Sequence, residues 1–324
     1  MTKMEQYSID QQLKRYSRLT LPCHKSNIHS VRWNPEGNLL ASGGKDKAMH
    51  LHRVVESELV FQQRYSNNGH TNDIDQLCWN PENSNLLATA SVDRQVKIWD
   101  VRYDDPVVSI KLKNENMTVC WSNNGTTIAV ADKADLVSFI DSRAGFKVAK
   151  DQKFQFEVGE ITWNKECDLF FVTSGDGKIH VLSYPDLQTL LVIDAFASPC
   201  VCIRFDATGR YFAVGSNDAI ASVWDSENLA CIQAIDRPDW PVKAVSFSHD
   251  SRYLASGSED SFIDIADIHT GEQIAAIDVN SPTLTLDFHP KEYILAYALN
   301  EHEYRDVGTI KVVGFPEERR RAYS

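Results

Sequence analysis

The chain has 324 residues, a formal net charge of −12 and a pI near 5.3. Because nucleic-acid affinity comes largely from neutralising phosphates, this charge argues against a protein whose whole surface binds DNA or RNA. No apolar run approaches the roughly eighteen residues of a membrane-spanning helix, and residues 1–13 are polar without a secretory pattern, so we expect no membrane partner.

Residues 17–21, after a polar segment at residues 1–16, alternate as a β-strand does. They precede seven repeated units, each opening with a short strand that ends on an anchor aromatic: Trp33, Trp79, Trp121, Trp163, Phe205, Phe247 and Phe288. The intervals are 46, 42, 42, 42, 42 and 41 residues. This period predicts an all-β, seven-bladed β-propeller and removes the α/β enzyme that length alone suggests.

Each unit continues with a turn rich in Asn, Asp, Gly or Pro and a second strand built around a small residue. An aspartate follows in a tight turn in five units, 13 or 14 residues after the anchor: Asp46, Asp93, Asp176, Asp218 and Asp260. Aspartate accepts hydrogen bonds from the amides of its own turn, so this placement has a local cause. A third strand begins shortly after the turn.

The third strand ends on Trp99-Asp100 in the second unit and on Trp224-Asp225 in the fifth. With these pairs the chain resembles the WD40-repeat propellers over roughly residues 17–315, which implies one propeller domain there and a polar tail at residues 316–324. The family's structural network of His, Ser or Thr, Asp and Trp is complete only in the second unit, at His70, Thr89, Asp93 and Trp99. We interpret it as stiffening a blade and not as catalytic.

Two other units carry incomplete versions of this network. The first has His24, Ser42 and Asp46 but places His52 where Trp is expected, and the fifth has Phe196 at the His position. We expect these blades to rely on packing. The last unit supplies only three strands, at 283–288, 293–299 and 308–315, so we predict that residues 17–21 add its outer strand and remove an open sheet edge.

No motif predicts catalysis, a cofactor or a metal centre. Gly175-Asp176-Gly177-Lys178 lacks the Ser or Thr of a phosphate-binding loop and opens a strand, so we interpret it as a β-turn. His50 and His52 share a strand face and are potential metal ligands, although an ordinary strand position is the favoured interpretation. The seven cysteines include no Cys-x-x-Cys pair, which favours reduced thiols in an intracellular protein.

Six of the seven tryptophans occupy repeat positions, and Trp240 does not. It lies in Arg237-Pro238-Asp239-Trp240-Pro241, a turn-forming segment before the first strand of the sixth unit. A large aromatic in such a loop either plugs a local hydrophobic gap or anchors a binding partner. The sequence leaves both interpretations open.

Several stretches are similar to the narrower THO complex subunit 3 family. They include Phe154-Gln155-Phe156-Glu157-Val158, Leu182-Ser183-Tyr184-Pro185 and Phe262-Ile263-Asp264-Ile265-Ala266, some of which replace expected repeat letters. This resemblance implies a nuclear, non-enzymatic scaffold of the THO/TREX complex, which couples transcription to mRNA processing and export. It implies elongated helical THO subunits as partners, mainly indirect contact with RNA, and no small-molecule substrate or cofactor.

Candidate partner contacts are residues beside the turn aspartates and in the proline-bounded loop: Lys45, Arg94, Asn217, Glu259, Asp239 and Trp240. For each of these residues except Trp240, an ordinary solvated position on the rim is the favoured interpretation. The alternative function is that of a substrate-recruiting adaptor of a ubiquitin ligase or a histone-peptide reader, because propellers host many functions.

Overall fold

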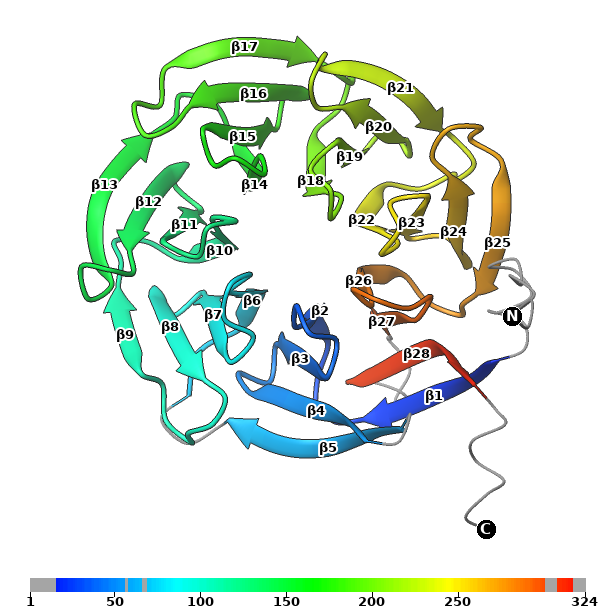
Figure 1. Ribbon diagram of the computed structural model, residues 1–324, viewed down its shortest axis with the longest axis horizontal. Helices are drawn as coiled ribbons and strands as arrows, with labels where there is room; N and C mark the ends of the chain where they lie inside the picture. The colour runs from blue at the N-terminus through cyan, green and yellow to red at the C-terminus, as the bar shows by residue number, and fades with distance from the viewer. Residues whose placement is uncertain (1–15, 56–57, 66–68, 301–307, 317–324) are drawn as a thin grey trace, which may run out of the picture.

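A computed structural model describes residues 16–55, 58–65, 69–300 and 308–316. These residues form seven four-stranded antiparallel sheets that radiate from a common centre like blades (Figure 1). The seven-bladed propeller expected from the repeat is thereby confirmed. No helix long and apolar enough to cross a membrane occurs in this part of the chain.

Six blades each consist of four consecutive strands, which are ordered from the centre of the disc to its rim. Blade 1 contains β2 (Ile28–Trp33), β3 (Leu39–Gly44), β4 (Met49–Val55) and β5 (Glu58–Tyr65). Blade 2 contains β6 (Ile74–Trp79), β7 (Leu86–Ser91), β8 (Gln95–Asp100) and β9 (Val108–Lys111). Blade 3 contains β10 (Asn116–Trp121), β11 (Thr127–Asp132), β12 (Leu136–Asp141) and β13 (Lys147–Lys153).

The next three blades repeat this order. Blade 4 contains β14 (Val158–Trp163), β15 (Leu169–Ser174), β16 (Lys178–Ser183) and β17 (Thr189–Asp194). Blade 5 contains β18 (Cys200–Phe205), β19 (Tyr211–Ser216), β20 (Ala221–Asp225) and β21 (Ala230–Ile235). Blade 6 contains β22 (Val242–Phe247), β23 (Tyr253–Ser258), β24 (Phe262–Asp267) and β25 (Gln273–Asp278).

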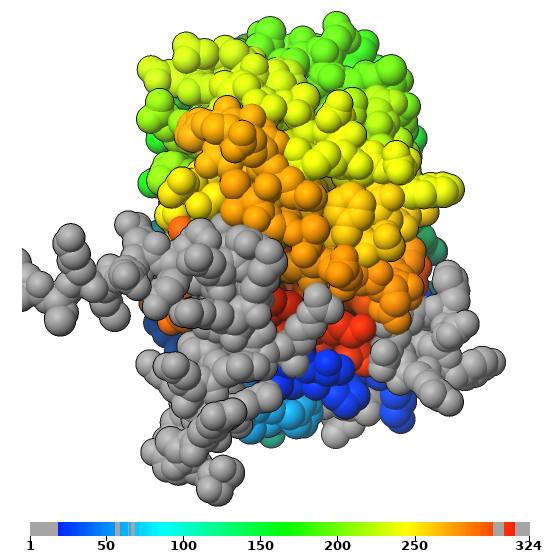
Figure 2. Space-filling view, turned by 90° about the vertical axis from the view of Figure 1, so that its right-hand side faces the viewer, coloured from blue at the N-terminus to red at the C-terminus, as the bar shows by residue number. Residues whose placement is uncertain are grey.

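Blade 7 joins the two ends of the described chain. It contains β26 (Thr283–Phe288), β27 (Leu295–Leu299), β28 (Thr309–Pro316) and, outermost, β1 (Tyr16–Pro22). Strand β1 pairs antiparallel with β28, placing Leu21 opposite Ile310, and the two strands lie side by side on the rim in Figure 2. The predicted closure by an N-terminal strand is confirmed.

The boundaries of the propeller differ slightly from the expected 17–315. Strand β1 starts at Tyr16 and β28 ends at Pro316, one residue beyond each expected limit. The rest of the polar segment at 1–16, the tail at 317–324 and the loop at 301–307 lie outside the described residues.

The hydrophobic core lies between neighbouring blades, because the inner strands of each sheet are covered on both faces by the adjacent blades. One cluster joins Phe171 and Val181 of blade 4 to Phe212 and Trp224 of blade 5. Second strands such as β7 and β19 are buried along most of their length, and their small residues let adjacent sheets approach closely. The rim strands are more exposed, so the disc is a stiff frame with accessible edges.

Candidate interaction site

The four residues of the predicted network meet inside blade 2. His70 Nδ1 lies 2.9 Å from Asp93, and His70 Nε2 lies 2.7 Å from Thr89 Oγ1. Trp99 Nε1 donates to the same hydroxyl at 2.9 Å. Burial acts to raise the pKa of Asp93, but the hydrogen bond and charge of His70 outweigh it and hold that pKa at about 2. The side chains satisfy one another, an arrangement that stiffens the blade.

Blade 1 keeps a polar network, contrary to the expectation that it relies on packing alone. His24 Nδ1 lies 2.8 Å from Asp46, and His24 Nε2 lies 2.8 Å from Ser42 Oγ. His52, at the Trp position, is buried and packs edge-on against Phe61. The missing tryptophan therefore shortens the network without abolishing it, because the histidine still has its two partners.

Blade 5 satisfies its polar groups differently. The Asp218 carboxylate accepts the amides of Ala197 and Ser198 at 3.0 and 2.9 Å, so no histidine is needed there. Trp224 Nε1 donates to Ser222 Oγ at 2.7 Å. Phe196, at the histidine position, packs at the edge of the hydrophobic cluster shared with blade 4. Packing and backbone capping together replace the network in this blade.

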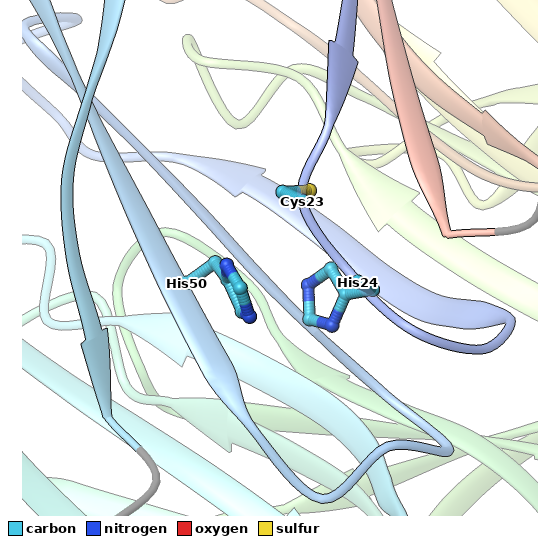
Figure 3. Close-up of side chains that lie close together, drawn as sticks. All are labelled: Cys23, His24 and His50. Carbon is cyan, nitrogen blue, oxygen red and sulfur yellow. The ribbon is translucent and has the colours of Figure 1, made fainter.

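Three potential metal ligands also converge in blade 1: Cys23, His24 and His50 (Figure 3). Their ligand atoms lie within 4.8 Å of one another, and His52 is not among them. Both ring nitrogens of His24 already face Asp46 and Ser42, and burial raises the pKa of the Cys23 thiol to about 12. A thiol held in its protonated form is a poor metal ligand, so this arrangement suits a structural role.

The buried His52 makes stability sensitive to acid. Burial lowers its pKa to about 4, and the nearby His24 adds to that effect. An unfolded histidine takes up a proton near pH 6.5, so the contribution of neutral His52 is present above pH 6.5 and is lost as the pH falls toward 4. Between pH 8 and pH 5 we expect the free energy of unfolding of the wild type to fall by about 2 kcal/mol more than that of His52→Phe. Urea unfolding at the two pH values measures both. Equal losses would show that His52 is not the source.

The predicted contacts beside the turn aspartates all lie on one face of the disc, called here the top face, which carries the turns between second and third strands. Lys45 and Arg94 are exposed on neighbouring blades 1 and 2, while Asn217 and Glu259 are exposed on neighbouring blades 5 and 6. The structure therefore does not gather them at one point. It forms a basic pair and a second pair that includes an acid, on different sectors of the ring.

Trp240 stands on the same face in a firmly held loop. The amides of Asp239 and Trp240 donate to the Asp260 carboxylate at 3.1 and 3.2 Å. Arg237 donates to Asp264 at 3.0 and 2.6 Å and to the carbonyl of Gly271 at 2.7 Å. The Trp240 side chain is 56% exposed. This exposure argues against a plug and presents a large aromatic on a fixed backbone.

Two rings of side chains at the centre escaped the sequence analysis. Inner strands of adjacent blades are not paired through their backbones, so side chains accept their amide protons instead. The lower ring, one residue before each anchor aromatic, is Arg32, Cys78, Cys120, Thr162, Arg204, Ser246 and Asp287. The upper ring, three residues before it, is Ser30, Gln76, Thr118, Glu160, Cys202, Ala244 and Thr285. These two repeat positions were the sequence signal that could have found them.

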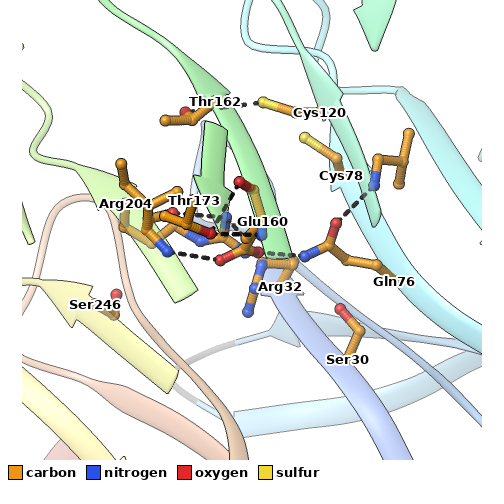
Figure 4. Close-up of polar contacts among 12 residues, drawn as sticks. Ser30, Arg32, Gln76, Cys78, Cys120, Glu160, Thr162, Thr173, Arg204 and Ser246 are labelled. Atoms are coloured by element: carbon orange, nitrogen blue, oxygen red, sulfur yellow. Dashed lines mark hydrogen bonds and ion pairs between the residues drawn. The ribbon is translucent and has the colours of Figure 1, made fainter. Parts of the chain in front are cut away.

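The rings join blades through hydrogen bonds and a partly buried ion pair (Figure 4). Glu160 lies 2.9 Å from Arg204 Nη1 and accepts the Ile203 amide at 2.8 Å. Gln76 donates to Glu160 and accepts the Val119 amide, so blades 2, 3, 4 and 5 are connected in one chain of contacts. Charge at the centre is thus used to hold the ring together.

The lower ring forms the floor of a funnel of about 560 Å³. All seven anchor aromatics line its wall. A smaller cavity of about 190 Å³, lined by the upper ring, opens at the other end of the centre. The repeat therefore builds a wide aromatic mouth on one side and a narrow polar one on the other.

Comparison with known proteins shows which family the chain is similar to. A family model described as the THOC3 beta-propeller domain matches residues 24–298. THO complex subunit 3 of Arabidopsis thaliana is 38% identical over 295 residues, covering 90% of this chain and 93% of that protein. WD repeat-containing protein AAC3 of Dictyostelium discoideum is 29% identical over 228 residues, covering 63% of this chain and 48% of that protein.

A solved structure supports the fold independently. The β-propeller domain of Myceliophteria thermophila Cps50 (Swd1) superposes with a TM-score of 0.78 and covers 91% of this chain and 99% of that domain. Its sequence identity is 15%, so this likeness concerns the propeller architecture.

Proposed function

Because this chain belongs to the THO complex subunit 3 β-propeller family, we propose that it is a non-enzymatic scaffold of a nuclear THO/TREX assembly. In this role it helps to couple transcription to mRNA processing and nuclear mRNA export through protein–protein contacts. The observation that carries the proposal is the 38% identity to a THO complex subunit 3 across 90% of the chain.

The architecture suits scaffolding for a physical reason. A closed ring of seven sheets is already ordered, so partners that dock on it incur little ordering cost from the propeller itself. The exposed Trp240 supplies a rigid aromatic, and the basic pair Lys45 and Arg94 lies on another sector of the same face. Different sectors can then hold different segments of the elongated helical THO subunits, with RNA reached mainly through the complex.

Affinity purification of the tagged chain from nuclear extract, with nuclease treatment and mass spectrometry, tests this function. We expect a stoichiometric set of THO subunits that survives removal of RNA. Recovery of a ubiquitin-ligase scaffold or of chromatin proteins without THO subunits would contradict the proposal while leaving the propeller intact. That outcome would favour the adaptor or histone-reader alternative.

Replacement of Trp240 by alanine is expected to lower recovery of at least one THO subunit about tenfold or more. The reason is that tryptophans which a partner buries on binding are frequent hot spots of interfaces. The change removes no core packing, so the melting temperature should stay within about a degree or two of the wild type. Tyr103→Ala is the matched control, since Tyr103 is 61% exposed in the turn after β8. Equal recovery of THO subunits with both variants would show that Trp240 does not contribute to the interface.

A further inference from the structure

Two arginines occupy equivalent places in the lower ring, and only one of them has a carboxylate partner. Arg204 of blade 5 lies 2.9 Å from Glu160 (Figure 4). Arg32 of blade 1 forms no ion pair with any residue that the structure describes, and its Nη1 donates only to neutral oxygens, among them the carbonyls of Val31 and Leu286 at 2.9 and 3.2 Å. The centre of the ring therefore holds one paired and one unpaired guanidinium.

The two carboxylates whose charges act on Arg32 are held by other groups. Glu160 pairs with Arg204, and Asp287 accepts the Trp33 amide at 2.8 Å. Burial lowers the pKa of Arg32, and the charge of Arg204 adds to this effect, whereas the charges of the two carboxylates oppose it without reversing it. Because removing a charge from water is costly, an arginine in such a place points to a counterion from outside the chain.

Arg32 lines the cavity of about 190 Å³ at one end of the centre, called here the upper cavity. With histidine counted as neutral, five charged side chains line it: Arg32, Arg204, Lys243, Asp75 and Glu160. Arg204 has Glu160 as its partner, and Lys243 Nζ lies 3.6 Å from Glu259, which is outside this lining. Among the described residues, Arg32 is the cation of the lining that lacks a carboxylate. Three cations against two carboxylates favour an anion in the upper cavity, although the net charge of the chain is −12.

The upper ring adds hydroxyl groups to the same cavity. Ser30 Oγ accepts the Leu77 amide at 3.3 Å, and Thr285 Oγ1 accepts the Val31 amide at 3.1 Å. A hydroxyl that accepts one hydrogen bond can still donate its own proton, and neither of these donates to another described residue. Thr118 Oγ1 is buried and has no hydrogen-bond partner among the described residues. The upper cavity thus offers hydroxyl protons as well as positive charge, and an acceptor for them is missing.

We propose that the upper cavity binds one tetrahedral oxyanion of the size of inorganic phosphate, with Arg32 as its counterion. The planar guanidinium of arginine matches the oxygens of such an anion with several parallel donors. Further cavity-lining groups come from other blades, Lys243 from blade 6 and Thr285 from blade 7. Donors from several directions suit an anion with four oxygens better than a planar carboxylate with two. A volume of about 190 Å³ has room for this ion and bound water, since a water molecule takes up about 30 Å³ of the liquid.

Thermal unfolding of the full-length protein in sodium phosphate and in sodium chloride, at pH 7 and equal ionic strength, tests this site. A ligand that binds only the folded state stabilises it in proportion to ln(1 + [L]/Kd). For a millimolar Kd, we expect about 50 mM phosphate to raise the melting temperature by about 3 °C over chloride. Isothermal titration calorimetry with sodium phosphate should give one site per chain.

Two arginine variants separate this site from the general stabilising effect of phosphate on proteins. Arg32→Met keeps a long side chain but removes the charge, and it should lose about two-thirds or more of the phosphate-dependent shift. Arg143→Met is the matched control and should keep the wild-type shift, because the Arg143 side chain is 71% exposed in the turn after β12. Exclusion of phosphate from the protein surface acts on both variants alike, so the difference between them reports binding at Arg32.

Lys243→Met gives a second measurement if Arg32→Met does not fold. It removes a partly exposed cation of the same lining, so calorimetry should show that the Kd for phosphate rises about threefold or more. The proposal is contradicted if calorimetry detects no phosphate binding to the wild type, or if Arg32→Met and Arg143→Met show equal phosphate-dependent shifts. An unchanged Kd in Lys243→Met would likewise contradict it.

Discussion

Deletion of residues 1–22 is expected to cost roughly 3–6 kcal/mol of folding free energy, or to abolish soluble folding. The deletion removes β1, whose Leu19 and Leu21 pack against Ile310 and Val312 of β28, two side chains that are fully buried in the complete chain. It also exposes the backbone edge of β28, which then becomes available for aggregation. Urea unfolding and soluble yield measure the effect.

A shorter deletion provides the control for this experiment. Removal of residues 1–13 leaves β1 intact and should unfold at the same urea concentration as the full chain. Should the long deletion prove insoluble, Leu21→Ala gives a second measurement, with an expected loss of about 1–2 kcal/mol for a partly buried leucine. If the 1–22 deletion unfolded like the full chain, ring closure by β1 would not contribute to stability.

Glu160→Ala is expected to destabilise the protein by about 2–4 kcal/mol, because it leaves the partly buried Arg204 guanidinium without its carboxylate. Burial acts to lower the pKa of Arg204, but the charge of Glu160 outweighs this and raises it. The alanine also removes the acceptor of the Ile203 amide and a partner of Gln76. Equilibrium urea unfolding of the variant and the wild type gives the difference directly.

Two companions make that measurement specific. Glu166→Ala removes an exposed carboxylate of the same blade and should change stability by less than about 0.5 kcal/mol. The double variant Glu160→Ala/Arg204→Ala should lose less than the sum of the single losses, because it no longer buries an unpaired charge. Strict additivity would mean that the ion pair carries no coupling across the ring.

The repeat made much of the fold predictable from the amino-acid sequence. A spacing of about forty-two residues repeats one physical unit, a sheet that cannot bury its faces alone, so the number of blades follows from the number of anchors. The missing outer strand of the last unit and the unpartnered residues 17–21 are complementary, which predicted the closure. The blade 2 network was also readable, because His70, Asp93 and Trp99 occupy consecutive turns and strands of one unit.

Other features depend on how side chains are placed in the folded chain. His24 and its partners were visible in the sequence, but their persistence despite His52 depends on side-chain geometry within blade 1. The sequence left Trp240 as either a plug or an anchor; its exposure argues against a plug, and its role as an anchor stays a prediction. Local patterns cannot decide such a case, because exposure is a property of the surrounding chain.

The amino-acid sequence by itself determined the all-β class and the seven blades, since these depend on periodicity and on residues close together along the chain. It also indicated the closing strand, because the last unit lacks an outer strand and residues 17–21 have no partner in their own unit. Only the tertiary structure decided which side chains meet at the centre. Glu160 and Arg204 belong to different units, as do Gln76 and Val119, and each looks like an ordinary inner-strand residue in its own unit. They become partners because seven twisted sheets close into a ring narrow enough to bring the inner strands of different blades into contact.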